Sequence, residues 1–443
     1  MELLKRPEVS DPGLDEAVKK LTPEQIEATI QKVLTKECAG RLEAYLETCV
    51  HCGLCANACH FCISHDYDPT YAPVAKVRNT MWEIVRQKGK VSPEFLKQAA
   101  RIAFTECNVC RRCSMYCPFG IDMAYMLLTV RRICHLVGLV PQYLQDTVNS
   151  HAVTMNQMWV QADDWIDALL WQEEEAADEV KGARIPLDKE GADFMYSVIG
   201  PEPKILAQLI GNFTQLARIA KLDWTMPSTD GWDNSNMAMY SGDFETMGRV
   251  ERLHWDTALK LKVKRIVMGE CGHAFRGAVY DGPKWVGWRS TPIPMVHAVE
   301  FYHDLIFKEK RVKIVKKFDK PITVQDPCNI VRGRGLGEKL RDLMRATCSD
   351  FRDVHPRFEH NYCCAAGGGV INCGPPWTPT RVAGNRTKAE QLKATGAAYV
   401  VTPCHNCHSG IEDVIKKHQL GMHTKFFIEI LVDVMEIPED LKA

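Results

Sequence analysis

Apolar residues recur at helical spacing through most of the first 175 residues. Residues 26–34 form one such stripe, and the preceding Thr22-Pro23-Glu24-Gln25 has the form of a capping box with proline at the first helical position. Further helices are expected over 74–87, 93–105 and 121–175. The first part of the chain is therefore predicted to be α-helical.

The pattern changes at about residue 236 to short apolar runs that alternate with amphipathic segments. Residues 265–268, 322–325 and 398–402 are predicted as buried strands with helices between them, which is an α/β architecture. Residues 176–235 contain scattered proline and glycine and are predicted to be a linker and insertion. The expected fold class is α followed by α/β.

The α/β part contains an internal repeat. Residues 264–273 resemble residues 398–407, and each segment is followed by a helix. A similar amphipathic block comes next in both copies, at 295–306 and 422–433. We therefore expect two related lobes, of which the second keeps a full set of cysteines.

A chain of 443 residues is too long for one ordinary core, and several domains are expected. The formal net charge of −1 gives no basic field for nucleic acid, and no run of 18 uncharged apolar residues is present. The N-terminus has no apolar segment of the secretory kind. The predicted domains are a helical extension (1–34), a helical cysteine-rich domain (35–145), a helical insertion and linker (146–235), a degenerate lobe (236–320) and a complete lobe (321–443).

Cysteine changes this picture, because the chain has 19 and most of them lie in tight clusters. Disulfide frameworks belong to small secreted domains, whereas clustered cysteines in a large chain without a signal peptide indicate metal or cluster binding. Two runs share the spacing C-x2-C-x2-C-x3-C. They consist of Cys49, Cys52, Cys55 and Cys59, and of Cys107, Cys110, Cys113 and Cys117.

This spacing is typical of proteins with two cubane [4Fe–4S] clusters, in which the fourth cysteine of each run ligates the other cluster. One cluster is therefore predicted on Cys49, Cys52, Cys55 and Cys117, and the other on Cys107, Cys110, Cys113 and Cys59. Zinc knuckles are the alternative, but zinc sites use C-x2-C pairs rather than such runs. The runs and the long spacer between them resemble the α-helical ferredoxin domain over roughly residues 35–145.

A third set of cysteines lies near the C-terminus. It comprises Cys328, the adjacent pair Cys363 and Cys364, and Cys404 with Cys407. The predicted strands place these five thiols at three strand ends, with Cys404 and Cys407 opening a helix whose dipole favours thiolates. The loop Ala365-Ala366-Gly367-Gly368-Gly369 follows the pair, and its first alanine should cost little if its φ is negative.

This third set resembles the cysteine-rich CCG domain of heterodisulfide reductases over about residues 236–435. The resemblance implies that Cys328, Cys363, Cys364, Cys404 and Cys407 hold one noncubane [4Fe–4S] cluster, which reductively cleaves a disulfide. The first lobe has Cys271 and His273 but no adjacent pair. Cys271 is a candidate for lining the site and His273 for donating a proton.

The order of the two domains, the single complete motif and the degenerate lobe resemble DsrK subunits of the DsrMKJOP membrane complexes. That resemblance implies a cytoplasmic catalytic subunit of dissimilatory sulfur metabolism, held at the inner face of the membrane by partners. A DsrM-like cytochrome b would exchange electrons with quinone, and a small DsrC-like carrier would supply the disulfide or trisulfide substrate. The direction of electron flow is left open.

A second hypothesis is an iron–sulfur relay subunit of a flavoprotein that oxidises glycolate or lactate, and a third is a zinc-stabilised interaction protein. Five clustered cysteines favour the reductase over a relay. No dinucleotide-binding glycine motif follows a strand, so no flavin or NAD is expected in this chain. The histidines His297, His303, His405 and His408 are expected to be structural, and Cys38, Cys62, Cys134 and Cys348 to be buried hydrophobic residues.

Overall fold

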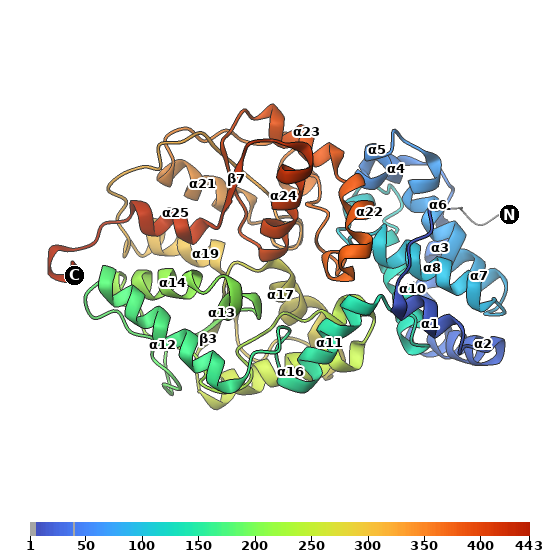
Figure 1. Ribbon diagram of the computed structural model, residues 1–443, viewed down its shortest axis with the longest axis horizontal. Helices are drawn as coiled ribbons and strands as arrows, with labels where there is room; N and C mark the ends of the chain where they lie inside the picture. The colour runs from blue at the N-terminus through green and yellow to red at the C-terminus, as the bar shows by residue number, and fades with distance from the viewer. Residues whose placement is uncertain (1–5, 39) are drawn as a thin grey trace.

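A computed structural model describes residues 6–38 and 40–443 of the chain. A helical region lies at one end of an elongated molecule, and two small parallel sheets with their covering helices form the rest (Figure 1). This arrangement confirms the predicted class, helical first and α/β second.

The helical region follows the predicted pattern closely. Thr22 forms the expected capping box, and Ser92 caps the helix that begins at Pro93. Two π-helical segments, Val33–Glu37 and Arg78–Trp82, continue helices rather than end them. The helices are α1 (Pro12–Val18), α2 (Pro23–Lys32), α3 (Arg41–Thr48), α4 (Leu54–Ala58), α5 (His60–Ser64), α6 (Pro73–Val77), α7 (Glu83–Arg86), α8 (Pro93–Thr105), α9 (Arg112–Met115) and α10 (Met123–Leu136).

The first sheet has the parallel order β2-β1-β3-β4 and starts earlier than predicted. Its first two strands, β1 (Phe194–Ser197) and β2 (Trp224–Thr225), lie inside the range 146–235 that was predicted as a helical insertion and linker. That prediction was wrong for these strands. Both are very short and buried throughout, so they show no alternation that would distinguish them from a loop.

The remaining elements complete this lobe, with β3 at the predicted position. They are α11 (Gln142–Thr154), α12 (Ala162–Glu179), α13 (Pro201–Ile205), α14 (Gln208–Ile219), α15 (Ala238–Ser241), α16 (Phe244–Lys260), β3 (Arg265–Met268), α17 (Gly272–Arg276), α18 (Gly282–Val286), β4 (Met295–His297) and α19 (Ala298–His303).

The second sheet is parallel with the order β5-β6-β7, and its first two strands were predicted. Its elements are β5 (Ile322–Val324), α20 (Val331–Arg334), α21 (Gly337–Thr347), α22 (Thr378–Ala383), α23 (Arg386–Ala394), β6 (Tyr399–Val401), α24 (His405–His418), β7 (His423–Lys425) and α25 (Phe427–Val434).

The predicted repeat is present in the structure. β3 leads through Cys271 into α17 and pairs with β4, as β6 leads through Cys404 into α24 and pairs with β7. The backbone N–H of each cysteine donates over 2.6 Å to the carbonyl two residues earlier. The two cysteines therefore occupy equivalent positions at the starts of equivalent helices.

The complete lobe packs against the helical region. α22 and α23 lie beside α4 and α5 (Figure 1), where His60 Nδ1 is 2.7 Å from the carbonyl of Gly384. The Asn108 side chain donates to the carbonyl of Gly367 over 2.8 Å, and Gly368 lies against the backbone of Asn108. These contacts place the third cysteine set next to the second run.

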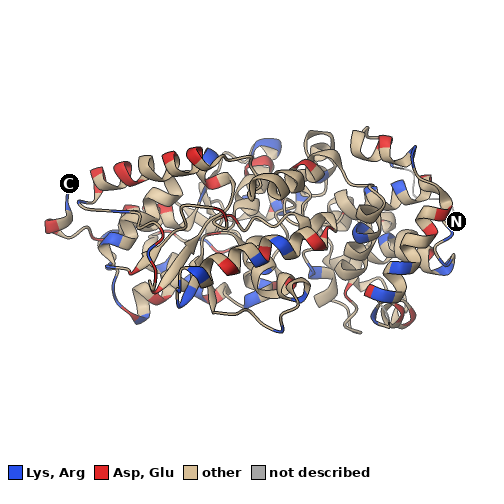
Figure 2. Ribbon diagram, turned by 90° about the horizontal axis from the view of Figure 1, so that it is seen from below, with Lys and Arg blue, Asp and Glu red and all other residues tan. Residues whose placement is uncertain are grey.

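Acidic and basic residues are both spread over the molecule (Figure 2), in keeping with the net charge of −1. Among the described residues, no helix has both the length and the apolar character needed to cross a membrane.

Candidate iron–sulfur sites

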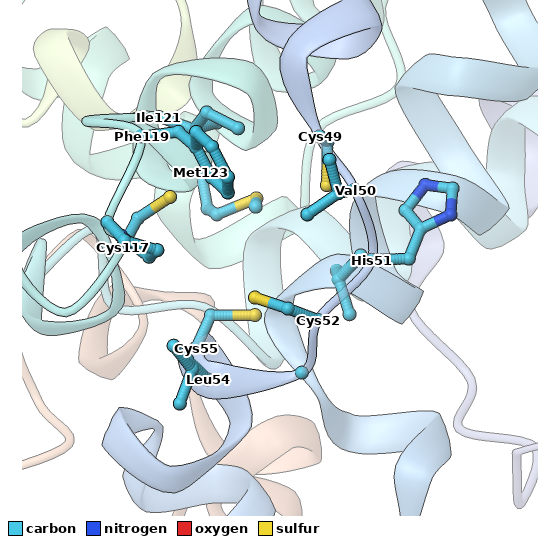
Figure 3. Close-up of a pocket in the computed structure, with 13 residues that line it drawn as sticks. Cys49, Val50, His51, Cys52, Leu54, Cys55, Cys117, Phe119, Ile121 and Met123 are labelled. Atoms are coloured by element: carbon cyan, nitrogen blue, oxygen red, sulfur yellow. The ribbon is translucent and has the colours of Figure 1, made fainter.

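The first cavity is bordered by Cys49, Cys52 and Cys55 of the first run and by Cys117 of the second (Figure 3). Their sulfur atoms point toward a common space. About 310 Å³ there is free of protein atoms, including the part open to solvent, which is roughly ten times the volume of a liquid water molecule. We call these four cysteines the outer site.

The local backbone explains how three cysteines so close in sequence can face one space. Gly53 has φ +80°, in the left-handed region, and so turns the chain between Cys52 and the start of α4 at Leu54. Cys49 ends α3. Only the second half of the run is helical, which leaves the first half free to wrap around the cavity.

The second cavity is bordered by Cys107, Cys110 and Cys113 together with Cys59 of the first run, and about 420 Å³ there is free of protein atoms. We call these four the middle site. The two runs thus exchange their fourth cysteines around the cavities, as their spacing led us to expect. Whether these groups ligate clusters stays a prediction, and no three Cys, His, Asp or Glu side chains in 6–38 and 40–443 have the spacing of a single metal ion.

The third set of cysteines comes together at the junction of the two lobes and the helical region. Cys328 follows β5, and Cys404 and Cys407 follow β6. Cys363 and Cys364 lie in a loop before Ile371, so the prediction of three strand ends was wrong for this pair. A loop can also bring a pair of cysteines close to a bound group, so this pair does not require a strand before it.

Thiol contacts join these cysteines to both neighbouring parts of the molecule. Neighbouring thiols lie close enough to shift each other's pKa in a row that runs from Cys110 to Cys363, on to Cys364, Cys407 and Cys404, and ends at Cys271. Cys328 lies within electrostatic reach of this row of six thiols. We call the row together with Cys328 the inner site. It starts at a cysteine that also borders the middle site.

Cys271 therefore lies at the inner site, although its lobe lacks the adjacent pair. Its Sγ is 3.2 Å from Nδ1 of His273, which also lies 3.2 Å from the amide nitrogen of Asn406. The other ring nitrogen of His273 is buried without a hydrogen-bond partner in the described structure. His405, expected to be structural, is buried beside the site as well, with Nδ1 3.0 Å from the carbonyl of Glu270.

Ala365 departs from the expectation of a negative φ, since its φ is +61°. This conformation costs an alanine on the order of 1 kcal/mol relative to glycine. The backbone turns here so that the N–H of Ala365 donates to Sγ of Cys363 over 3.4 Å. The backbone at Ala365, just before the glycines, is therefore more strained than predicted.

Buried cations surround the thiols, and this suits an anionic group. Lys76, Arg112 and Arg131 donate to backbone carbonyls, among them those of Glu106, Ala58 and Cys107. Lys388 donates to Asn361 and Gln391. None of these four has a carboxylate within ion-pair distance in the described part of the chain. Buried charges are normally paired, so the residues present fit clusters with thiolate ligands.

The pKa values reflect the same environment. Hydrogen bonds from Cys271 and Cys407 hold the pKa of Cys404 well below its usual range, and those from Cys363 and Cys407 do so for the pKa of Cys364. Burial raises the pKa of the Cys328 thiol to about 12 and lowers the pKa of Lys388 to about 8. A hydrogen bond from Cys363 likewise holds the pKa of Cys110 well below its usual range. Thiolates are the metal-binding form of cysteine, and three of them are favoured even before any metal binds.

The cysteines expected to be hydrophobic residues, Cys38, Cys62, Cys134 and Cys348, are all buried. No prediction was made for a fifth cysteine, Cys373. It is also buried and lies against the carbonyl of Gly369. The positions of Lys388 and Arg332 beside the thiols were not predicted either. A helical pattern does not show whether its lysine or arginine lies in solvent or against buried groups, so no signal in the sequence could have identified them.

Two family models match the chain. A 4Fe-4S dicluster domain covers residues 45–121 and a cysteine-rich domain covers residues 322–412. The first range contains every cysteine of the outer and middle sites, and the second contains five of the inner site. These matches support iron–sulfur clusters as cofactors.

Several relatives align with most of the chain. The Hdr-like menaquinol oxidoreductase iron-sulfur subunit 2 of Archaeoglobus fulgidus is 28% identical over 385 residues, which cover 74% of this chain and 68% of the relative. One subunit of the dihydromethanophenazine:CoB–CoM heterodisulfide reductase of Methanosarcina acetivorans is 26% identical, and the alignment covers 83% of this chain and 88% of the relative. The EtfAB:quinone oxidoreductase of Syntrophomonas wolfei is 22% identical, with 75% and 46% covered. These similarities support an iron–sulfur oxidoreductase.

Proposed function

We propose that this chain is the catalytic subunit of a disulfide reductase of the heterodisulfide-reductase type. One observation carries the proposal: the thiols of Cys363, Cys364, Cys404 and Cys407 gather in one buried cluster, with Cys110 of the middle site packed against it and Cys271 beside Cys404. A relay that only passed electrons would need no such convergence beyond two cubanes. The similarity to a component of a heterodisulfide reductase supports the same chemistry.

We further propose that the outer and middle sites each hold a cubane [4Fe–4S] cluster, on the cysteine groups that border the two cavities. Cys328, Cys363, Cys364, Cys404 and Cys407 would hold a noncubane cluster. The exchange of Cys59 and Cys117 between cavities supports the first assignment. The match to the cysteine-rich domain supports the second.

A bound inner cluster would supply single electrons and an iron position for a substrate sulfur. The residues of the chain then have separate tasks. Cys271 borders the site beside Cys404, and the buried cations Lys388 and Arg131 lie near thiols of the inner and middle sites, where their positive charge favours thiolates. Reduction of a disulfide to two thiols takes two electrons and two protons, and His273 is the candidate donor for one proton because its ring lies beside the thiols.

The proposed partners follow from the relatives. One is named as part of a menaquinol oxidoreductase, which supports electron supply from a quinol through a membrane partner resembling cytochrome b. Within this group we propose a DsrK-like role, with a small DsrC-like protein as the disulfide or trisulfide substrate. The chain would then lie at the cytoplasmic face of the membrane through its partners.

The test compares two cysteine variants of the anaerobically purified and reconstituted chain. Cys364→Ala removes a proposed inner ligand, and Cys348→Ala removes a buried cysteine away from the sites. We expect reduction of bis(2-hydroxyethyl) disulfide by reduced viologen to fall at least about 100-fold in the first variant only. The thiol-dependent electron paramagnetic resonance (EPR) signal of the oxidised protein should disappear with it. An unchanged rate and signal in Cys364→Ala would favour an electron relay instead.

A further inference from the structure

A cleft opens from solvent onto the middle and inner sites. It is bordered by Arg111, Arg276, Tyr280 and Arg332 and reaches the thiols of Cys110 and Cys328. About 550 Å³ there is free of protein atoms, including the part open to solvent. We call it the arginine cleft. A substrate that reaches the inner site through it must pass three guanidinium groups.

No Asp or Glu is among the described residues that border the cleft, although Asp122 lies 3.4 Å from Nε of Arg111 and Asp281 lies 2.6 Å from Nε of Arg276. Arg332 has no carboxylate within ion-pair distance in the described structure. Arg332 gives its donors to the backbone carbonyls of Glu359, Cys110 and Asn361, at 2.7, 2.6 and 2.9 Å. These bonds fix the guanidinium at the cleft wall without neutralising it. Arg332 is therefore a positioned cation beside the thiol of Cys328.

Arg276 supplies a second, independent observation. Its side chain is 3% exposed, and its Nε donates to Asp281 over 2.6 Å while Nη1 lies 3.3 Å from the carbonyl of Val109. The remaining nitrogen, Nη2, is buried and has no hydrogen-bond partner within the described structure. An unpaired buried donor is costly, and an acceptor from a ligand in the cleft would satisfy it.

We propose that the arginine cleft binds an anionic group, most simply a carboxylate, that the substrate carries close to its disulfide. The inference rests on the proposed function, because it assigns the class of disulfide that the inner site receives. Guanidinium groups bind carboxylates through two parallel hydrogen bonds, and such charged hydrogen bonds are among the strongest in proteins. The carboxylate belongs either to a small thiol acid or to the C-terminus of a protein.

A rival role for the arginines is to balance the charge of bound clusters. That role predicts equal effects on all disulfides, whereas an anion site predicts an effect on acidic ones alone. A neutral and an acidic disulfide of similar size therefore separate the two roles.

The first experiment measures binding without turnover. Calorimetric titration of the cluster-loaded, oxidised full-length chain compares 3,3′-dithiodipropionate with bis(2-hydroxyethyl) disulfide. We expect the dianion to bind at least about tenfold more tightly, and this preference to disappear in Arg276→Gln and in Arg332→Gln. Arg334→Gln, an exposed neighbour paired with Glu300, is the matched control and should keep it. Equal affinity for both probes in the unaltered chain would overturn the inference.

Iron content and melting temperature of each variant show whether it folds and loads its clusters. If Arg276→Gln fails to fold, Arg332→Gln carries the test, because that side chain is only partly buried. If both fold and still prefer the dianion, the anion site is not in this cleft.

The second experiment measures turnover with reduced viologen. KM for the dianion should rise at least about tenfold in the two variants while kcat/KM for the neutral disulfide is kept. Equal losses for both would assign the arginines to the clusters and overturn the inference. If the unaltered chain reduces neither disulfide, the proposed function fails, while the binding result still decides whether the anion site exists.

A third comparison identifies the source of the carboxylate. The disulfide dimer of Gly-Gly-Cys-Gly is titrated with free and with amidated C-termini. Tighter binding of the free acid than of 3,3′-dithiodipropionate supports a protein C-terminus, and the reverse order supports a small acid. Loss of binding on amidation confirms in either case that the carboxylate is what the cleft recognises.

Discussion

Cys110 has an unusual position at the scale of single residues, because it borders the middle cavity and also contacts Cys363 of the inner site. Its backbone carbonyl accepts from Arg332, which in turn is fixed to the carbonyls of Glu359 and Asn361. One cysteine of the helical region is thus tied to the complete lobe through both its side chain and its backbone.

The exchange of fourth cysteines can be tested by counting iron. If Cys117 belongs with Cys49, then Cys117→Ala and the double variant Cys117→Ala/Cys49→Ala should each lose the same cluster, about four irons per chain. Cys117→Ala/Cys107→Ala should lose two clusters, about eight irons, because Cys107 borders the other cavity. Iron and acid-labile sulfide are measured after anaerobic reconstitution.

Cys134→Ala serves as the control for these variants, since Cys134 is buried in the helical core away from both cavities and should leave the iron content unchanged. A loss of only four irons, approximately, in Cys117→Ala/Cys107→Ala would mean that each run keeps its own fourth cysteine.

At the scale of elements, the glycine loop after Cys364 joins the complete lobe to the second cysteine run. Gly368 has φ +66°, and its carbonyl accepts from Arg131, whose guanidinium also donates to the carbonyl of Cys107. A Cβ at Gly368 would collide with the carbonyl oxygen of Asn108. The loop is therefore glycine-rich because two backbones meet there.

Gly368→Ala should lower the free energy of unfolding by about 2–4 kcal/mol, from the left-handed conformation and the collision together. Gly367→Ala is a closely matched control, because a Cβ there meets nothing within 4 Å and its φ is outside the left-handed region. Thermal unfolding followed by circular dichroism measures both variants. Equal melting temperatures would contradict the close approach of loop and run.

Elements also show how far the sequence could predict this molecule. The cysteine groups at the outer and middle cavities could be predicted because their spacing is local and the fold repeats a regular motif. The strands β1 and β2 could not, since four and two buried residues carry no periodicity. Arg276 and Arg332 meet Cys110 only through the fold, so the arginine cleft left no pattern along the chain.

At the scale of the whole molecule, the three sites differ in their access to solvent. Cys52 of the outer site is exposed, and it is the one exposed cysteine among the residues that the structure describes. The middle-site cysteines are half-buried, and those of the inner site are buried except for Cys110, which it shares with the middle site, and Cys328 at the cleft. The rim of the outer site is apolar, with Val50, Leu54 and Phe119 about half exposed or more. Cys55 of the outer site is buried as well, so the gradient from the surface to the proposed catalytic site rests on Cys52 at one end and on the buried inner-site thiols at the other.

This gradient predicts the order in which the clusters are lost to a chelator. With bathophenanthroline disulfonate under anaerobic conditions, we expect iron release in a fast phase of about four irons, followed by slower phases. The fast phase belongs to the outer site, because the reagent can reach the cavity beside Cys52 without any opening of the fold. The inner cluster should be lost last, since the arginine cleft reaches only Cys110 and Cys328 there and the other inner-site thiols are buried. Cys117→Ala, which lacks the outer cluster, should show the slow phases alone, whereas a fast phase that survives in this variant would place the most accessible iron elsewhere.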